Sequence, residues 1–91
     1  HLIPIEVEVD TLGQLEQALE AGVNLVLLDN MAPEVLSKAV AMCKGRAKTE
    51  ASGGITPETV QAVAETGVDF IAMGYLTHST TALDIGLDFS A

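Results

Sequence analysis

Apolar and polar positions follow two different periods along this chain, and each change of period marks a new element. Residues 3–9 alternate apolar and acidic side chains with period two, which predicts a strand. Residues 25–28 and 70–73 are short, continuous apolar runs, which are typical of buried strands covered on both faces. Residues 47–51 show a weaker strand pattern. The chain therefore carries four expected strands.

Apolar side chains recur at helical spacing between these strands. This spacing predicts three helices, over residues 11–21, 33–44 and 56–66. A glycine follows each of them: Gly22, Gly45 and Gly67. Pro33 suits the first position of the second helix, and Thr56 is the expected N-cap residue of the third.

The order of these elements indicates the fold class. Strands and helices alternate, which predicts an α/β fold with a parallel sheet of βα repeats. Residues 20–26 also resemble residues 65–71, so two βα units make one visible repeat. Four βα units are about half of the eight that close a TIM-like α/β barrel. Because half a barrel leaves sheet edges unpaired, we expect residues 1–91 to be a fragment that other residues complete.

Charge and composition exclude several classes of function. Four Lys and Arg residues face thirteen Asp and Glu residues, for a net charge of −9. Such a chain is repelled by nucleic acids and anionic membranes, so we expect it to bind neither. No apolar run approaches the roughly 20 residues that cross a bilayer. The single cysteine, Cys43, is typical of a buried thiol in a reducing, cytoplasmic setting.

Acidic residues near the ends of two strands are the first candidates for chemistry. Glu6 and Glu8 share one face of the first strand, which would point into a barrel. Buried carboxylates there need a metal ion, a cation or donor hydroxyls, whereas a solvated edge strand would need none. Asp29 directly follows an apolar strand, where it could bind a sugar hydroxyl or Mg²⁺, or only cap the following turn.

Glycine loops after the third and fourth strands are the second group of candidates. They comprise Ser52, Gly53 and Gly54, and Met73, Gly74 and Tyr75. Adjacent loops of this kind form a phosphate site in barrel proteins, although a single glycine pair more often marks a turn. His78 follows the second loop, and it is either a phosphate donor or an exposed histidine.

Several motifs in a fixed order connect the chain to a known family. The motifs are residues 6–9 (EVEV), 27–31 (LLDNM), 50–56 (EASGGIT), 65–69 (ETGVD), 74–79 (GYLTHS) and 82–85 (ALDI). Together they resemble the C-terminal part of the barrel domain of the quinolinate phosphoribosyltransferase family. The resemblance covers nearly the whole chain.

The resemblance implies a reaction and a set of roles. Family members transfer a phosphoribosyl group from 5-phosphoribosyl 1-diphosphate to quinolinate with Mg²⁺, and release diphosphate and CO2 to give nicotinate mononucleotide for NAD synthesis. Catalytic Glu8 and Asp29 would hold the ribose hydroxyls, directly or through the metal ion. The two glycine loops would bind the 5-phosphate, Tyr75 through its backbone, and His78 would support them.

The resemblance also implies what residues 1–91 lack. Family members carry an N-terminal sandwich domain and the first barrel strands, which supply Arg, Lys and His residues for the dicarboxylate and the diphosphate. They form homo-oligomers, dimers or hexamers built from dimers, whose neighbouring subunits help to close the site. We therefore expect the isolated 91 residues to be inactive.

Two other interpretations remain open at this stage. The chain could come from a related protein, either a nicotinate phosphoribosyltransferase or a homologue associated with molybdate transport. It could also be a non-enzymatic half barrel that assembles through its open edges. A cluster of Arg, Lys and His residues suited to two carboxylates would favour quinolinate as the substrate.

Overall fold

A computed structural model of the chain describes residues 5–73, which form one parallel sheet with three helices. The strands are β1 (Glu6–Val9), β2 (Leu25–Asp29), β3 (Lys48–Ser52) and β4 (Phe70–Ile71). The helices are α1 (Leu12–Glu20), α2 (Pro33–Cys43) and α3 (Val60–Ala64). Each strand pairs with the next one along the chain, in the order β1-β2-β3-β4, and all pairs are parallel. The predicted α/β class is confirmed.

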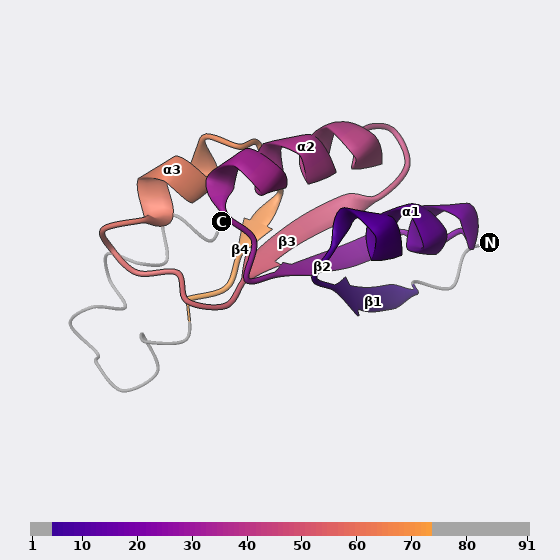
Figure 1. Cartoon of the computed structure of the whole chain (residues 1–91), viewed down its shortest axis with the longest axis horizontal. Helices are drawn as coiled ribbons and strands as arrows, with labels where there is room; N and C mark the ends of the chain where they lie inside the picture. Colours follow the sequence, from indigo (N-terminus) through magenta and orange to yellow (C-terminus); the bar gives the residue numbers. More distant parts are fainter. Residues whose placement is uncertain (1–4, 74–91) are drawn as a thin grey trace.

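All three helices lie on the same side of the sheet, as Figure 1 shows. Val26 and Leu28 of β2 face them and are fully buried, whereas Leu25 and Leu27 on the other face are only half-buried. Phe70 of β4 remains 42% exposed. The expectation that these strands are covered on both faces is therefore wrong for residues 5–73, because the second face has no layer packed against it here.

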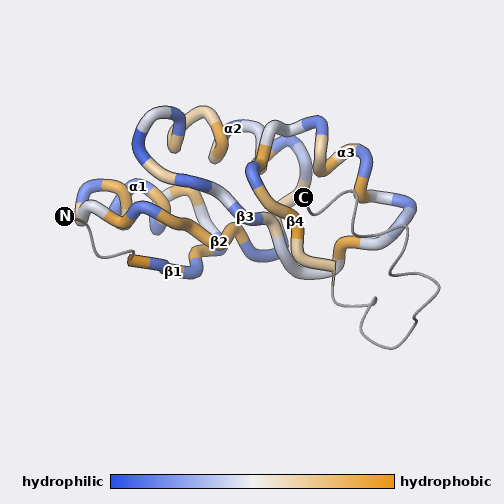
Figure 2. The backbone as a smooth tube through the Cα atoms, turned by 180° about the vertical axis from the view of Figure 1, so that it is seen from behind, coloured by the Kyte–Doolittle hydropathy of each residue, from blue (hydrophilic) through white to orange (hydrophobic). Residues whose placement is uncertain are grey.

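The core lies between the sheet and the helices, and it explains the periodicity of the sequence. Leu15 and Ala18 of α1 and Leu36 and Ala39 of α2 supply the helical stripes of this core. Helix α1 contacts β1, α2 contacts β3, and the two helices contact each other. Figure 2 shows the apolar segments along β2 and β4, while β3 is more polar. Polar Thr49 is nevertheless among the buried residues of β3. The weak strand pattern of β3 reflects this mixture.

The ends of the first two helices agree with the sequence prediction. The Oγ1 atom of Thr11 accepts a hydrogen bond from the N–H of Gln14 and caps α1. Pro33 opens α2, where its missing N–H leaves no helical hydrogen bond unmade.

Within residues 5–73, no helix is both long and apolar enough to cross a bilayer.

The third helix is shorter than the sequence predicts. Its regular part begins at Val60 with Thr59 at the N-cap, so the prediction that Thr56 is the N-cap is wrong. The Thr56 carbonyl accepts hydrogen bonds from the N–H groups of both Thr59 and Val60, at 3.0 and 2.9 Å. Thr59 Oγ1 in turn accepts the N–H of Thr56 at 3.0 Å. This side-chain bond closes an irregular turn where a first helical turn was expected.

Candidate functional site

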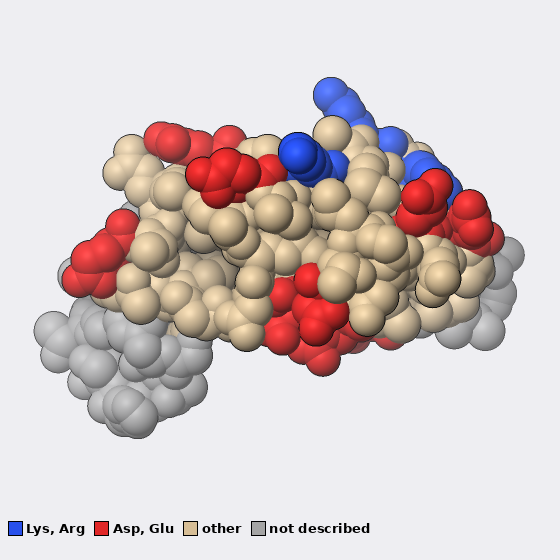
Figure 3. Space-filling view, in the orientation of Figure 1, with Lys and Arg blue, Asp and Glu red and all other residues tan. Residues whose placement is uncertain are grey.

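The carboxyl ends of β1 and β2 meet at a small cleft of about 180 Å³. Its lining consists of Glu8, Val9, Asp10, Gln14 and Asp29. The register explains the meeting, because Glu8 lies beside Leu27, two residues before Asp29 on the same face of β2. Two carboxylates predicted to bind a sugar thus line one cleft. Figure 3 shows acidic side chains gathered below these strand ends.

The structure also separates two glutamates that the sequence leaves equivalent. Glu6 lies one step earlier on the same face of β1, where it pairs with Leu25 at the start of β2. It does not line the cleft, whereas Glu8 does. Position along the strand therefore favours Glu8 as the partner of Asp29.

The first glycine loop begins where β3 ends, beside Asp29. Ser52 pairs with Asp29 in the sheet register, and its Oγ atom lies 3.5 Å from Oδ1 of Asp29, which is a long hydrogen bond. Gly53 and Gly54 follow with φ values of 84° and 68°. Residues with a side chain rarely adopt this left-handed backbone, so the loop requires glycine for its shape.

The backbone donors of this loop have no acceptor within the described chain. None of the N–H groups of Gly53, Gly54 and Ile55 donates a hydrogen bond to another residue among residues 5–73. Backbone N–H groups seldom stay unpaired, so ligands or water commonly complete such a loop. The loop can therefore offer several neutral donors to one anion.

The second glycine loop is only partly described. The N–H of Ala72 donates to the carbonyl of Ala51 at 2.9 Å, so the chain leaves β4 beside the end of β3. Met73 is half-buried and packs against the core. Gly74, Tyr75 and His78 lie outside the described residues.

Of the predicted site residues that the structure describes, five lie together at the carboxyl ends of β1, β2 and β3. They are Glu8, Asp29, Ser52, Gly53 and Gly54.

Three polar residues near the cleft were missed by the sequence analysis. Asp10 lines the cleft just after β1, and its backbone N–H donates to Oε1 of Gln14 at 2.9 Å. Asn30 follows Asp29 with a left-handed backbone. Glu50 shares the open face of the sheet, paired with Leu27 and Phe70. Glu50 stands two residues before Ser52, which places both on one face of the strand, and this spacing was the available signal.

The cleft suits a metal ion only in part. Among residues 5–73, no group of three or more His, Cys, Asp and Glu side chains converges as a complete metal site. Mg²⁺ commonly takes one or two carboxylates, and water and substrate phosphates supply its other ligands. Glu8 and Asp29 fit that donor set, since both are carboxylates on one cleft.

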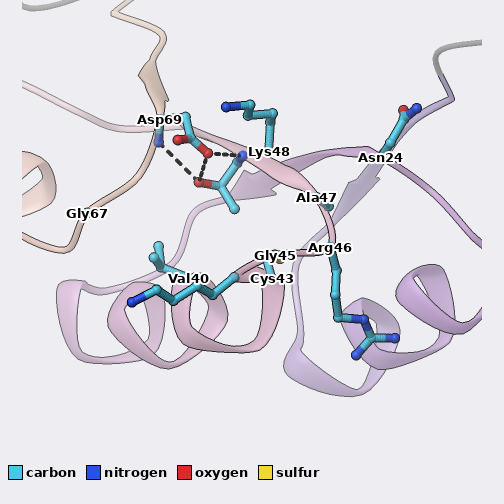
Figure 4. Close-up of a pocket in the computed structure, with 11 residues that line it drawn as sticks. Asn24, Val40, Cys43, Gly45, Arg46, Ala47, Lys48, Gly67 and Asp69 are labelled. Carbon is cyan, nitrogen blue, oxygen red and sulfur yellow. Dashed lines mark hydrogen bonds between the residues drawn. The ribbon is translucent and has the colours of Figure 1, made fainter.

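A larger hollow of about 630 Å³ lies at the opposite end of the sheet, where β3 and β4 begin. Lys44, Arg46 and Lys48 line it, and Figure 4 shows the side chains of Arg46 and Lys48 pointing to different sides. Cys43 also lines this hollow. The pKa of its thiol is raised, chiefly by burial, while the charge of Arg46 lowers this pKa and the charge of Asp69 raises it. In parallel α/β folds, sites form at the carboxyl ends of strands, so we assign the site to the smaller cleft.

Parallel strands with helices on one face and polar groups at their carboxyl ends define an α/β protein of the barrel type. Residues 1–88 match the family described as "Quinolinate phosphoribosyl transferase, C-terminal domain". The chain therefore belongs to the quinolinate phosphoribosyl transferase family, and its match lies in the C-terminal domain of that family.

Individual relatives agree with this assignment. The chain is 47% identical to a nicotinate-nucleotide pyrophosphorylase (carboxylating) of Mycobacterium leprae, over 94% of this chain and 31% of the relative. It is 40% identical to the chloroplastic enzyme of that name from Oryza sativa, over 93% of this chain and 27% of the relative. The chain thus spans about a third or less of the curated relatives that it matches.

Solved structures confirm the partial barrel. A nicotinate-nucleotide pyrophosphorylase from Ehrlichia chaffeensis matches with a TM-score of 0.77 and 38% identity, over 81% of this chain and 27% of that one. The protein of that name from Francisella tularensis matches with a TM-score of 0.70 and 44% identity, over 72% of this chain and 24% of that one.

Proposed function

We propose that residues 1–91 form the ribose-binding and phosphate-binding part of a quinolinate phosphoribosyltransferase. The enzyme would transfer the phosphoribosyl group of 5-phosphoribosyl 1-diphosphate to the ring nitrogen of quinolinate. Diphosphate and CO2 would leave, and nicotinate mononucleotide would form. The observation that carries the proposal is the cleft shared by Glu8 and Asp29, directly beside the Ser52–Gly54 loop.

The two carboxylates would act on the ribose. Carboxylate oxygens accept hydrogen bonds from hydroxyl groups, so Glu8 and Asp29 can fix the orientation of the sugar. Positive charge develops at the anomeric carbon as diphosphate leaves, and preorganised carboxylates stabilise such charge. Mg²⁺ would neutralise the diphosphate when it is bound, with Glu8 and Asp29 as its protein ligands.

The glycine loop would hold the 5-phosphate. The N–H groups of Gly53, Gly54 and Ile55 have no acceptor among residues 5–73, which leaves them available to phosphate oxygens. Helix α3 has only five residues, so the expected contribution of its dipole is small and the loop must do most of the binding. Met73, Gly74 and Tyr75 would extend this loop, and His78 would support it.

The rest of the site must come from outside residues 1–91. Quinolinate and diphosphate are anionic, whereas this chain has a net charge of −9. Figure 3 shows its Lys and Arg side chains over α2 and the turn after it, away from the acidic side chains at the strand ends. We propose that cationic residues from further barrel strands, and from a second subunit of a cytoplasmic homo-oligomer, complete the site.

Product formation tests the proposal directly. The full-length protein that contains this segment would be incubated with quinolinate, 5-phosphoribosyl 1-diphosphate and Mg²⁺, and nicotinate mononucleotide and CO2 would be measured. We expect turnover by the full-length protein and none by the 91 residues alone. Nicotinate in place of quinolinate is the control, and turnover of nicotinate without CO2 release would refute the proposed substrate.

A further inference from the structure

Asn30 has an unusual backbone, and it directly follows Asp29 of the candidate cleft. It is the one residue other than glycine with a positive φ among residues 5–73, and its φ is 56°. The left-handed conformation is strained for most residues, and asparagine tolerates it better than most. Asn30 directly follows Asp29, so this conformation sets how the chain turns away from the end of β2.

The backbone of Asn30 is hydrogen-bonded to the neighbouring loop, and its side chain lies beside it. Its N–H donates to the carbonyl of Ser52 at 3.0 Å. A methyl group placed on Gly53 would lie 2.8 Å from Oδ1 of Asn30 and 2.6 Å from Oδ1 of Asp29. These oxygens therefore occupy the space that a side chain at position 53 would need. Gly53 is required here by its neighbours as well as by its own φ.

We propose that Asn30 is a positioning residue that fixes the distance between the Asp29 carboxylate and the Gly53–Gly54 loop. This inference rests on the proposed function, in which Asp29 holds the ribose and the loop holds the 5-phosphate of the same substrate. The two groups are covalently joined in 5-phosphoribosyl 1-diphosphate, so their binding sites must keep one separation. Asn30 connects both sites, through the peptide bond to Asp29, through its N–H bond to the Ser52 carbonyl and through its Oδ1 atom, which occupies the space beside Gly53.

A purely structural role for Asn30 makes a different prediction. If only the left-handed turn matters, glycine should replace asparagine fully, because glycine adopts positive φ without strain. If the side chain keeps the loop at its distance, glycine should preserve stability but loosen the binding of one substrate. The substrates are distinguishable, since quinolinate contacts neither the ribose carboxylates nor the loop in the proposed function.

The decisive experiment compares Asn30→Gly and Asn30→Ala in the full-length enzyme. Misplacement of binding groups by about 1 Å can cost on the order of 100-fold in rate. We expect Asn30→Gly to keep its Tm and to lose roughly 10-fold to 100-fold in kcat/KM for 5-phosphoribosyl 1-diphosphate, with KM for quinolinate within about twofold. Asn30→Ala should add a loss of Tm. Kinetics of Asn30→Gly equal to wild type, or an equal rise in KM for both substrates, would overturn the proposal.

Asn24→Gly is the matched control. Asn24 lies directly before the first residue of β2, at the end of that strand opposite Asp29 and Asn30. Its Oδ1 atom accepts a hydrogen bond from the N–H of Ile5 at 2.9 Å. We expect this variant to lower Tm and to leave both KM values unchanged. If it reproduced the substrate-specific effect of Asn30→Gly, general loosening of β2 would explain both variants, and the proposal would be wrong.

A second readout does not depend on activity. The cost of Gly53→Ala in unfolding free energy would be measured in wild type and in Asn30→Gly. We expect a smaller cost in Asn30→Gly, because one of the two clashing oxygens is removed. Equal costs would contradict the contact itself. If wild type failed to turn over quinolinate, the proposed function would fall, while this coupling would still report whether Asn30 positions the loop.

Discussion

The carboxylate of Asp69 accepts two hydrogen bonds from the buried residue Thr49. Its Oδ2 atom lies 2.8 Å from the backbone nitrogen of Thr49 and 3.2 Å from its Oγ1 atom. The Asp69 N–H returns bonds of 3.1 Å to the carbonyl oxygen and to Oγ1 of Thr49. Figure 4 shows this reciprocal pair at the edge of the larger hollow. It ties the segment before β4 to the start of β3.

The same device occurs 45 residues earlier in the repeat. Asn24 stands where Asp69 stands, and its Oδ1 accepts the N–H of Ile5 at 2.9 Å while its own N–H donates to the carbonyl of Ile5. In both repeats, the residue directly before one strand is hydrogen-bonded to the beginning of the neighbouring strand. Asn24 before β2 bonds to Ile5 at the start of β1, and Asp69 before β4 bonds to Thr49 near the start of β3. The sequence similarity of residues 20–26 and 65–71 therefore records a shared way of starting each new strand.

Removal of the Asp69 carboxylate should destabilise the protein. Asp69→Ala leaves the N–H and the hydroxyl of buried Thr49 without this acceptor, and an unsatisfied buried donor costs about 1–3 kcal/mol. Asp69→Asn should lower the free energy of unfolding much less, because the amide oxygen of Asn24 accepts the equivalent backbone hydrogen bond in the first repeat. Denaturant unfolding of the full-length protein measures both, and equal losses would contradict the role of the acceptor.

The two cleft carboxylates should be needed for turnover. We expect Glu8→Gln and Asp29→Asn each to lower kcat on the order of 100-fold to 1,000-fold, as the loss of one preorganised charge-stabilising group does. Glu6→Gln is the matched control, because Glu6 lies on the same face of β1 but outside the cleft. Steady-state kinetics check this prediction, and a similar loss in Glu6→Gln would show that the face as a whole matters.

Gly53 should tolerate a side chain less well than Gly45. Both have positive φ, of 84° and 76°, so alanine carries a similar backbone cost of about 1–2 kcal/mol at each. A methyl group at Gly45 meets nothing within 4 Å, whereas at Gly53 it meets Asp29 and Asn30. We expect Gly53→Ala to lose more stability and to raise KM for 5-phosphoribosyl 1-diphosphate. Equal Tm losses, with unchanged KM, would refute the clash.

Alkaline pH should weaken the fold through Cys43. Burial raises the pKa of this thiol above its ordinary value of 9.0. A raised folded-state pKa means that the folded protein holds the proton more tightly, so the stabilisation is fully present below about pH 9 and is lost as the pH rises further. Denaturant unfolding at a series of pH values measures this loss. The slope above pH 9 should be smaller in Cys43→Ala, and an unchanged slope would exclude the thiol as its cause.

The fold could be predicted largely because its signals are local. Periodicity and helix-start residues such as Pro33 depend on neighbours in sequence, and they identified the order of helices and strands. The cleft followed from the rule that parallel strands end together, which brought Glu8 to Asp29. Exposure of Phe70 could not be predicted, because an apolar run looks the same whether one face or both are covered.

The missed features depend on contacts between distant segments. Asn30 reads as an ordinary turn residue until Gly53 lies beside it, 23 positions later. The late start of the third helix is a smaller case, since Oγ1 of Thr59 accepts the N–H of Thr56 and closes a separate turn before Val60. Such local side-chain bonds are poorly encoded in propensities, which average over many environments.

The sequential strand order has a consequence for local opening. Among residues 5–73, β2 and β3 have a neighbouring strand on both sides, whereas β1 and β4 each have one. In the 91 residues alone, amide protons should therefore exchange with deuterium first along β1 and β4 and last at Leu28 and Ala51, which are also buried. The slowest-exchanging amides would then lie within a few residues of Asp29 and Ser52. The slowest-exchanging part of the sheet would therefore support the strand ends at which the substrate is proposed to bind.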